Sequence, residues 1–222
     1  MAQQHVLAGR NVAAVGFYRE LTTRYPEAEQ VWFELGIAAA GSLDFRLAET
    51  ALQQASRLSA QNAELLILIA QQFHRVRLPD LARDCYRRAA AVAPGSSHAA
   101  LSLSAWLERE RQLPEAWSCV ENCLASNPKD LHTLYYRTFL LHRMGRNMEA
   151  EAGLRELLHS ESKDAGFKSS VLHLLGVVMD ALGDYAQALG FLQQSKSILQ
   201  RTANTQSLLH CSMTIILHFS DN

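Results

Sequence analysis

Alanine recurs at a spacing of 34 residues along most of this 222-residue chain. The series comprises Ala14, Ala48, Ala82, Ala116 and Ala150 and, after a slip of four residues, continues at Ala188. A fixed period between about 20 and 50 residues is typical of proteins in which one supersecondary unit is repeated and stacked. The spacing therefore constrains the fold before any local secondary structure is considered.

Residues of matched size accompany each alanine of this series. A large apolar side chain follows four residues later, at Tyr18, Leu52, Tyr86, Val120, Leu154 and Leu192. A small residue precedes it by twelve residues, at Ala2, Gly36, Ala70, Ser104, Thr138 and Gly176. Small residues that face each other let two helices approach closely, while large residues fill the space beside them. The pattern predicts a repeated hairpin of two antiparallel helices.

Proline and glycine occur where such hairpins should begin, turn and end. The prolines all lie at expected helix ends, at Pro26, Pro79, Pro94, Pro114 and Pro128. Proline is tolerated there but costs about 3 kcal/mol inside a helix. Gly145 and Gly183 lie in expected turns, where a residue with positive φ commonly ends a helix. Because no segment alternates as a strand does, the sequence predicts an all-α protein.

The residues resemble the tetratricopeptide repeat family, whose pattern is W-x₂-L-G-x₂-Y, then A-x₃-F, then P. Trp32, Leu35 and Gly36, followed by Ala48 and Leu52, match this pattern closely. The resemblance implies a right-handed α-solenoid of antiparallel helix hairpins. It predicts a single array over 1–222, with a clipped repeat at 1–28, whole repeats at 29–62, 63–96, 97–130, 131–164 and 169–202, and a terminal helix at 203–219.

The sequence departs from the family pattern at a few positions. Arg137 stands where the pattern has leucine, and Ala60 and Ser162 replace the terminal proline. An insertion around the letters KDAGFK shifts the register before the last whole repeat. We therefore expect the superhelix to be irregular near residues 160–168.

Composition and charge narrow the classes of partner. The chain is 48% hydrophobic and 19% charged, with a formal net charge of -1, so it lacks the excess of basic residues typical of nucleic-acid-binding proteins. No apolar run approaches the about 20 residues of a membrane-spanning helix, and the N-terminus has no secretion-signal pattern. The sequence predicts a cytoplasmic protein that binds neither nucleic acid nor membrane.

Catalytic and metal-binding motifs are absent from the sequence. It contains no phosphate-binding, dinucleotide-binding, nucleophile-elbow or zinc-protease motif. His98 and His132 occupy equivalent places in adjacent repeats, about 10 Å apart, too far to share one metal ion. The four cysteines lack zinc spacing and are interpreted as free thiols: Cys85, Cys119, Cys123 and Cys211. Cys119 and Cys123 share one helix face and are interpreted as small packing residues. We therefore expect no enzymatic activity, no metal and no cofactor.

The family resemblance also implies where a partner would bind. In relatives the first helix of each hairpin lines a concave groove. The residues expected to form this groove are Phe33, Ile37, Ile67, Gln71, His74, Arg75, Leu101, Arg109, Tyr135, Phe139, His142, Arg143, His173 and Val177. Aromatic residues would anchor a protein or peptide, and three arginines spaced by 34 residues would orient its carboxylates. In the alternative interpretation, the apolar residues are core between repeats and the arginines a solvated face.

Two alternatives concern the C-terminal end. The last whole repeat resembles those that precede the catalytic domain in bacterial tetratricopeptide-repeat sulfotransferases, and similar arrays precede glycosyltransferase domains. The chain would then be the substrate- or partner-recruiting portion of a longer transferase. The segment 206–219 is apolar on two sides, one of which includes Leu208 and Ile216 and the other Ile215 and Phe219. We expect this terminal helix to pack against a second copy of the chain, as a homodimer, or against a missing C-terminal domain.

Overall fold

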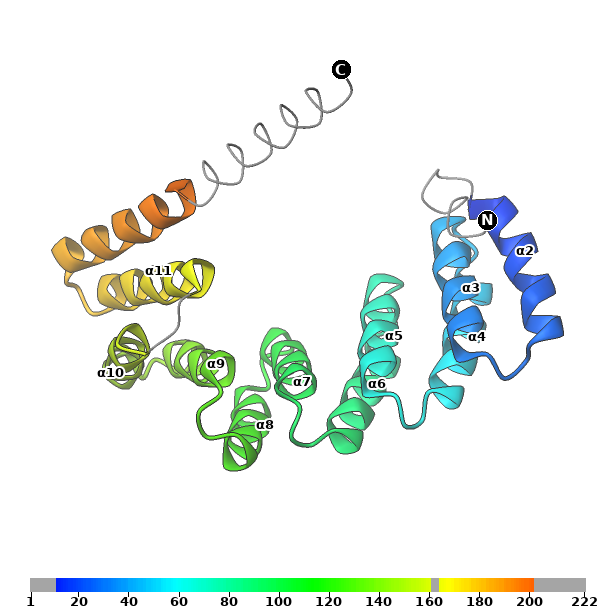
Figure 1. Cartoon of the computed structure of the whole chain (residues 1–222), viewed down its shortest axis with the longest axis horizontal. Coiled ribbons are helices and arrows are strands. Elements are labelled where there is room, and N and C mark those ends of the chain that lie inside the picture. The colour runs from blue at the N-terminus through cyan, green and yellow to red at the C-terminus, as the bar shows by residue number, and fades with distance from the viewer. Residues whose placement is uncertain (1–10, 161–163, 202–222) are drawn as a thin grey trace, which may run out of the picture. The chain divides into compact units, whose positions relative to one another are not determined.

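The computed structural model describes residues 11–160 and 164–201. Within these ranges the chain forms antiparallel helices joined by short turns, and no strand occurs among the described residues (Figure 1). The helices are α2 (Asn11–Arg24), α3 (Glu29–Gly41), α4 (Phe45–Leu58), α5 (Ala63–Arg75), α6 (Pro79–Val92), α7 (Ser97–Arg109), α8 (Leu113–Ser126), α9 (Leu131–Arg143), α10 (Asn147–Leu158) and α11 (Ala165–Ala181), followed by a helix over 185–201. The expected all-α architecture of helix hairpins is confirmed.

The chain divides into two compact units, Met1–Asn127 and Pro128–Asn222. In the first unit α2 packs against α3, the helices pair as α3–α4, α5–α6 and α7–α8, and each hairpin contacts the next through α4–α5 and α6–α7. In the second unit α10 packs against both α9 and α11. The single array over 1–222 stays a prediction, and the terminal helix at 203–219 lies outside the described residues.

Helix starts follow from the residues that precede them. Asn62, Ser96, Asp130 and Asp164 each accept a hydrogen bond from a backbone N–H in the first turn of α5, α7, α9 and α11, respectively. Such caps satisfy donors that have no partner inside the helix. Pro79 and Pro114 instead lie at the first positions of α6 and α8, where a missing N–H costs nothing.

No helix among the described residues has the length and apolarity that a membrane span requires.

The register alanines lie where the paired helices meet. All six are buried: Ala14, Ala48, Ala82, Ala116, Ala150 and Ala188. Ser104 Oγ donates a hydrogen bond to the Ala116 carbonyl at 3.2 Å, which joins the small residue of α7 to the alanine of α8. A Cβ atom on Gly36 would lie only 2.7 Å from Leu52 Cδ2. The expected match of small and large residues is therefore seen in these contacts.

Enlarging a register alanine should destabilise its hairpin. Ala116 is fully buried against α7, so Ala116→Leu is expected to lower the free energy of unfolding by about 1–3 kcal/mol through overpacking. Urea unfolding followed by circular dichroism measures this change. Ala125→Leu, on the exposed side of the same helix, is the matched control and should change stability little. Equal effects of the two substitutions would contradict the proposed packing.

The turns between paired helices share one backbone feature. Gly145 and Gly183 have φ values of 77° and 86°, as the sequence predicted. The same place in the other three turns is taken by Leu43, Arg77 and Arg111, with φ values of 65°, 62° and 61°. Side chains other than glycine adopt this left-handed conformation only at a cost of about 1–2 kcal/mol. The turn geometry is therefore kept even where the residue does not favour it.

Candidate functional site

The expected groove residues of the first unit differ in how much surface they offer. Phe33 and Ile67 are buried, with 5% and 0% of their surface exposed, which leaves almost nothing for a ligand to contact. Ile37 and Leu101 are half-buried. Gln71, on α5, is exposed. In this unit the accessible part of the predicted groove is therefore mainly polar.

Basic side chains provide most of that polar surface. His74 and Arg75 at the end of α5, and Arg109 at the end of α7, are exposed. Arg75 Nη1 donates to Gln72 Oε1 at 2.8 Å, and Arg109 Nε donates to the Ala105 carbonyl at 3.1 Å. These bonds use one of the five N–H groups of each guanidinium. The remaining N–H groups are available to a carboxylate.

The second unit carries the aromatic part of the predicted groove, on α9 and α11. We call the set of predicted residues in this unit the α9–α11 surface: Tyr135, Phe139, His142, Arg143, His173 and Val177. Arg143 and His173 are exposed, and the other members are half-buried. Residues four apart share one face of a helix, as Tyr135 and Phe139 do on α9. The unit therefore presents partly accessible rings on α9 and exposed basic side chains on both α9 and α11.

Ring contacts fix the orientation of these aromatic side chains. The Tyr135 ring packs edge-to-face on Phe167 of α11, with ring centroids 6.0 Å apart, and His132 packs on the same ring at 5.3 Å. Phe139 packs against Tyr136 at 5.4 Å. Burial raises the pKa of the Tyr135 hydroxyl above its usual value, so this group is neutral at physiological pH. The sequence interpretation missed Phe167, because it placed the start of the last whole repeat at residue 169, after this ring.

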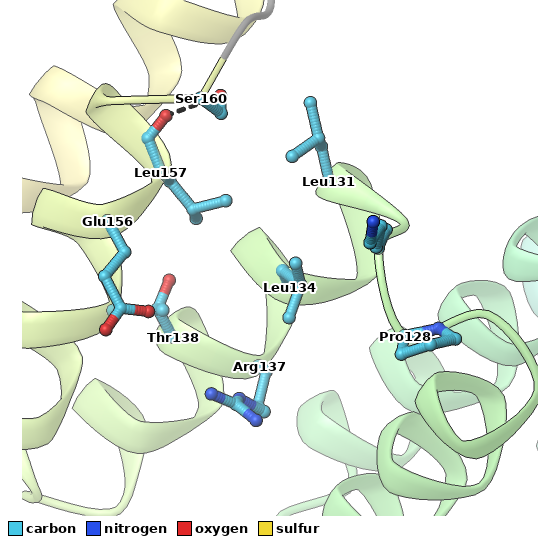
Figure 2. A pocket seen from close by; sticks show the side chains of 10 residues that line it. Pro128, Leu131, Leu134, Arg137, Thr138, Glu156, Leu157 and Ser160 are labelled. Carbon is cyan, nitrogen blue, oxygen red and sulfur yellow. Dashed lines mark hydrogen bonds between the residues drawn. The ribbon is translucent and has the colours of Figure 1, made fainter.

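A cavity of about 580 Å³ lies in the second unit between α9 and α10 (Figure 2). Its apolar wall includes Pro128, Leu131 and Leu134 from the start of α9 and the residues before it, and Leu157 from α10. Its polar wall includes Lys129, Arg137, Thr138, Glu156 and Ser160. The size is within the range of about 300–1,000 Å³ that is typical of ligand pockets.

The cavity lining differs from the other hairpins at two positions. Gly153 occupies the position taken by Ala51, Cys85, Cys119 and Phe191 in the other hairpins. A Cβ atom there would lie 2.7 Å from Thr138 Cγ2, so the close approach of α10 to α9 requires glycine. At the place of Leu134, the first whole hairpin has Trp32, whose indole Nε1 donates to the Pro26 carbonyl at 2.8 Å. The cavity thus lies where another hairpin places an indole ring.

Arg137 is one of three charged residues in the cavity wall, together with Lys129 and Glu156. The other hairpins carry apolar residues at this position: Leu35, Ile69, Leu103 and Leu175. Arg137 Nε is buried and has no hydrogen-bond partner among the described residues. A buried donor without a partner costs about 1–3 kcal/mol. The sequence showed this departure from the family pattern, but only the structure shows that Arg137 lines a cavity together with Gly153.

Other candidate reactive groups among the described residues include two thiols and a histidine–glutamate pair. Burial raises the pKa of the Cys85 and Cys119 thiols, which keeps both protonated and unreactive at neutral pH. His98 Nδ1 lies 2.8 Å from Glu64 Oε2. No group of three histidine, cysteine or carboxylate side chains that could hold a metal ion occurs among the described residues.

Comparison with known proteins rests on structure. No family model matches the chain, and no curated protein sequence matches it. PilW, described as a widely conserved type IV pilus biogenesis factor, superposes with a TM-score of 0.60 at 16% identity, over 94% of each chain. MamA superposes with a TM-score of 0.59 at 16% identity, over 81% of this chain and 96% of its own. YrrB, described as a TPR protein with an unusual peptide-binding site, superposes with a TM-score of 0.51 at 16% identity, over 85% of this chain and 87% of its own.

These superpositions agree with the observed contacts within the chain. The 34-residue spacing, the buried alanines and the helix hairpins with a conserved turn all belong to one repeated unit. The chain has the tetratricopeptide-repeat fold.

Proposed function

We propose that the protein is a non-catalytic scaffold that binds a peptide or protein segment through the first helices of its hairpins. The observation that carries this proposal is the α9–α11 surface, where α9 carries half-buried aromatic rings and exposed Arg143, and α11 carries exposed His173. Aromatic and arginine side chains dominate the binding energy of protein interfaces. The peptide-binding site named in the description of YrrB supports the same kind of function for a chain of this fold.

The surface favours an acidic partner with apolar residues. Rings held by neighbouring rings lose little conformational freedom on binding, which reduces the entropic cost of association. The exposed basic side chains would pair with carboxylates. In the first unit, Arg75 and Arg109 provide a second basic surface that would act in the same way. Nothing among the described residues favours the transferase alternative, and we do not propose it.

A peptide-selection experiment tests the α9–α11 surface. Phage-displayed random peptides are selected on the wild-type chain, and their affinities are then measured for a Phe139→Ala/Arg143→Ala variant. Loss of one aromatic anchor and one cation is expected to weaken binding at least about tenfold. Circular dichroism and thermal unfolding show whether the variant remains folded.

The control removes the same residue types from another part of this unit. Tyr185 and Arg146 are both exposed and lie outside the α9–α11 surface. A Tyr185→Ala/Arg146→Ala variant should therefore bind the selected peptides as the wild type does. If no peptide is enriched, or if the two double variants bind equally well, the assignment of this surface is wrong.

A further inference from the structure

We propose that the turn between α5 and α6, together with the end of α7, binds an acidic peptide segment that carries two carboxylates three residues apart. The binding surface consists of Arg75, Arg77 and Arg109, and we call it the first-unit arginine surface. The inference rests on the proposed peptide-binding function, but it concerns the Met1–Asn127 unit and names the partner segment. The α9–α11 surface belongs to the other unit, so the two surfaces can be tested separately.

All three arginines are exposed and have N–H donors to offer. The Arg77 guanidinium makes no hydrogen bond or ion pair within the described part of the chain. Arg75 and Arg109 each use one N–H group, in bonds of 2.8 Å to Gln72 Oε1 and of 3.1 Å to the Ala105 carbonyl, respectively. A guanidinium has five N–H donors, arranged in a fork that matches the two oxygens of a carboxylate. Each side chain can therefore bind a carboxylate without losing a bond that it makes now.

Packing within the first unit brings these arginines to one edge. Helix α5 contacts α7 directly, and packed helices have axes about 8–10 Å apart. Because α6 is antiparallel to both helices, Arg75 and Arg109, which are their last residues, lie at the same edge of the unit. Burial raises the pKa of Tyr86 on α6, and the charge of Arg109 opposes this shift. The Arg109 guanidinium is therefore close enough to the α5–α6 hairpin to act on one of its side chains.

The distribution of charge favours a short acidic segment. Residues 74–83 contain three arginines and one acidic residue, Asp80, which pairs with Arg83 at 2.7 Å. The corresponding stretches of the neighbouring hairpins, 40–49 and 108–117, each contain more acidic than basic residues. The α5–α6 turn therefore offers two uncompensated positive charges, and the turns on both sides would repel a longer acidic run. A segment with two carboxylates matches this distribution.

The spacing of the helices selects the spacing of the two carboxylates. A polyproline II segment has three residues per turn and rises about 3.1 Å per residue, so side chains three residues apart share one side and lie about 9 Å apart. This distance matches the about 8–10 Å between packed helix axes. One carboxylate would bind Arg75 and Arg77 at the turn, and the other would bind Arg109. We therefore expect the motif Glu-x-x-Glu, with proline favoured between the acids because it fixes this conformation.

The backbone at Arg77 permits a substitution that removes a cation without disturbing the fold. Its φ of 62° favours glycine, so Arg77→Gly should unfold at the same urea concentration as the wild type or higher. Arg111 has a φ of 61° at the equivalent place in the next turn and lies outside the first-unit arginine surface. Arg111→Gly is therefore the matched control, because it removes the same side chain from the same backbone conformation.

NMR titration of the isotope-labelled chain with two short peptides tests the proposal. The first probe is acetyl-Glu-Pro-Pro-Glu-amide, and the second, acetyl-Pro-Glu-Glu-Pro-amide, has the same composition and charge but adjacent acids. The first probe should shift the backbone amide signals of residues 74–78 and 108–110, and it should bind at least about threefold more tightly than the second. Arg77→Gly should weaken binding of the first probe at least about threefold, and Arg111→Gly should weaken it less than about twofold.

The outcomes distinguish this inference from the proposed function. The first-unit arginine surface is wrongly assigned if the first probe does not bind, if the two probes bind equally well, or if Arg111→Gly weakens binding as much as Arg77→Gly does. The Phe139→Ala/Arg143→Ala variant should leave binding of the first probe unchanged. Selected peptides that bind the α9–α11 surface while the first probe fails would remove the first-unit arginine surface alone. Binding of the first probe without any selected peptide would remove the α9–α11 surface alone.

Discussion

Replacing Leu52 with alanine is expected to lower the free energy of unfolding by about 2–5 kcal/mol. Leu52 is fully buried, and its side chain lies directly over Gly36 of the paired helix α3. Truncation removes apolar contacts and leaves a cavity that rigid helices fill only in part. Urea unfolding followed by circular dichroism gives the change in free energy. Leu68→Ala, at a leucine with 43% of its surface exposed, is the control and should cost less.

A double-mutant cycle with Gly36 tests whether the two residues pack as the structure indicates. In the wild type, a Cβ atom at position 36 would lie 2.7 Å from Leu52 Cδ2, so Gly36→Ala should destabilise despite the better helix propensity of alanine. In the Leu52→Ala background the added methyl group meets no such atom and occupies part of the new space. The coupling energy should be about 0.5–3 kcal/mol in the stabilising direction. Additive effects would mean that the two positions do not touch.

The triple variant Leu43→Gly/Arg77→Gly/Arg111→Gly is expected to gain about 2 kcal/mol in stability. All three residues are exposed and have positive φ. Each loses a left-handed strain of about 1–2 kcal/mol, offset by the greater chain entropy of glycine in the unfolded state, about 0.4–1 kcal/mol. Because the three turns lie in different hairpins, the gains should add. The rise in urea midpoint is the measurement.

Alanine at the same three positions is the matched control for this gain. Alanine removes the long side chains but keeps the Cβ atom that makes positive φ costly. The alanine variant should therefore show little or no increase in stability. If it gains as much as the glycine variant, the benefit comes from removing exposed side chains and not from relief of backbone strain.

Much of the fold could be predicted from sequence because its decisive contacts are local. The alanine of one helix meets a small residue only twelve positions earlier, as Ser104 and Ala116 do, so one-dimensional spacing already encodes the helix pair. Proline positions then mark where helices begin and end. The two turn glycines, Gly145 and Gly183, were also predicted, and their φ values confirm the expectation.

The candidate sites were harder to predict because they depend on how much each side chain is covered. Phe33 and Ile67 occupy places that face the groove in relatives, yet neighbouring residues cover both almost completely. Phe167 joins Tyr135 only because α11 begins earlier than the expected repeat. The cavity needs Arg137 and Gly153, which lie on different helices. The repeat spacing showed that Arg137 departs from the family pattern, but it did not show which residues surround Arg137.

The distribution of the left-handed turn residues determines in which unit glycine substitutions can stabilise the protein. Leu43, Arg77 and Arg111 all lie in the Met1–Asn127 unit, whereas the two glycines lie in the Pro128–Asn222 unit. Glycine substitution at these three exposed positions is therefore expected to stabilise the first unit. A destabilising mutation in that unit can be offset by glycine substitution at one of these positions. The second unit already has glycine at the corresponding positions.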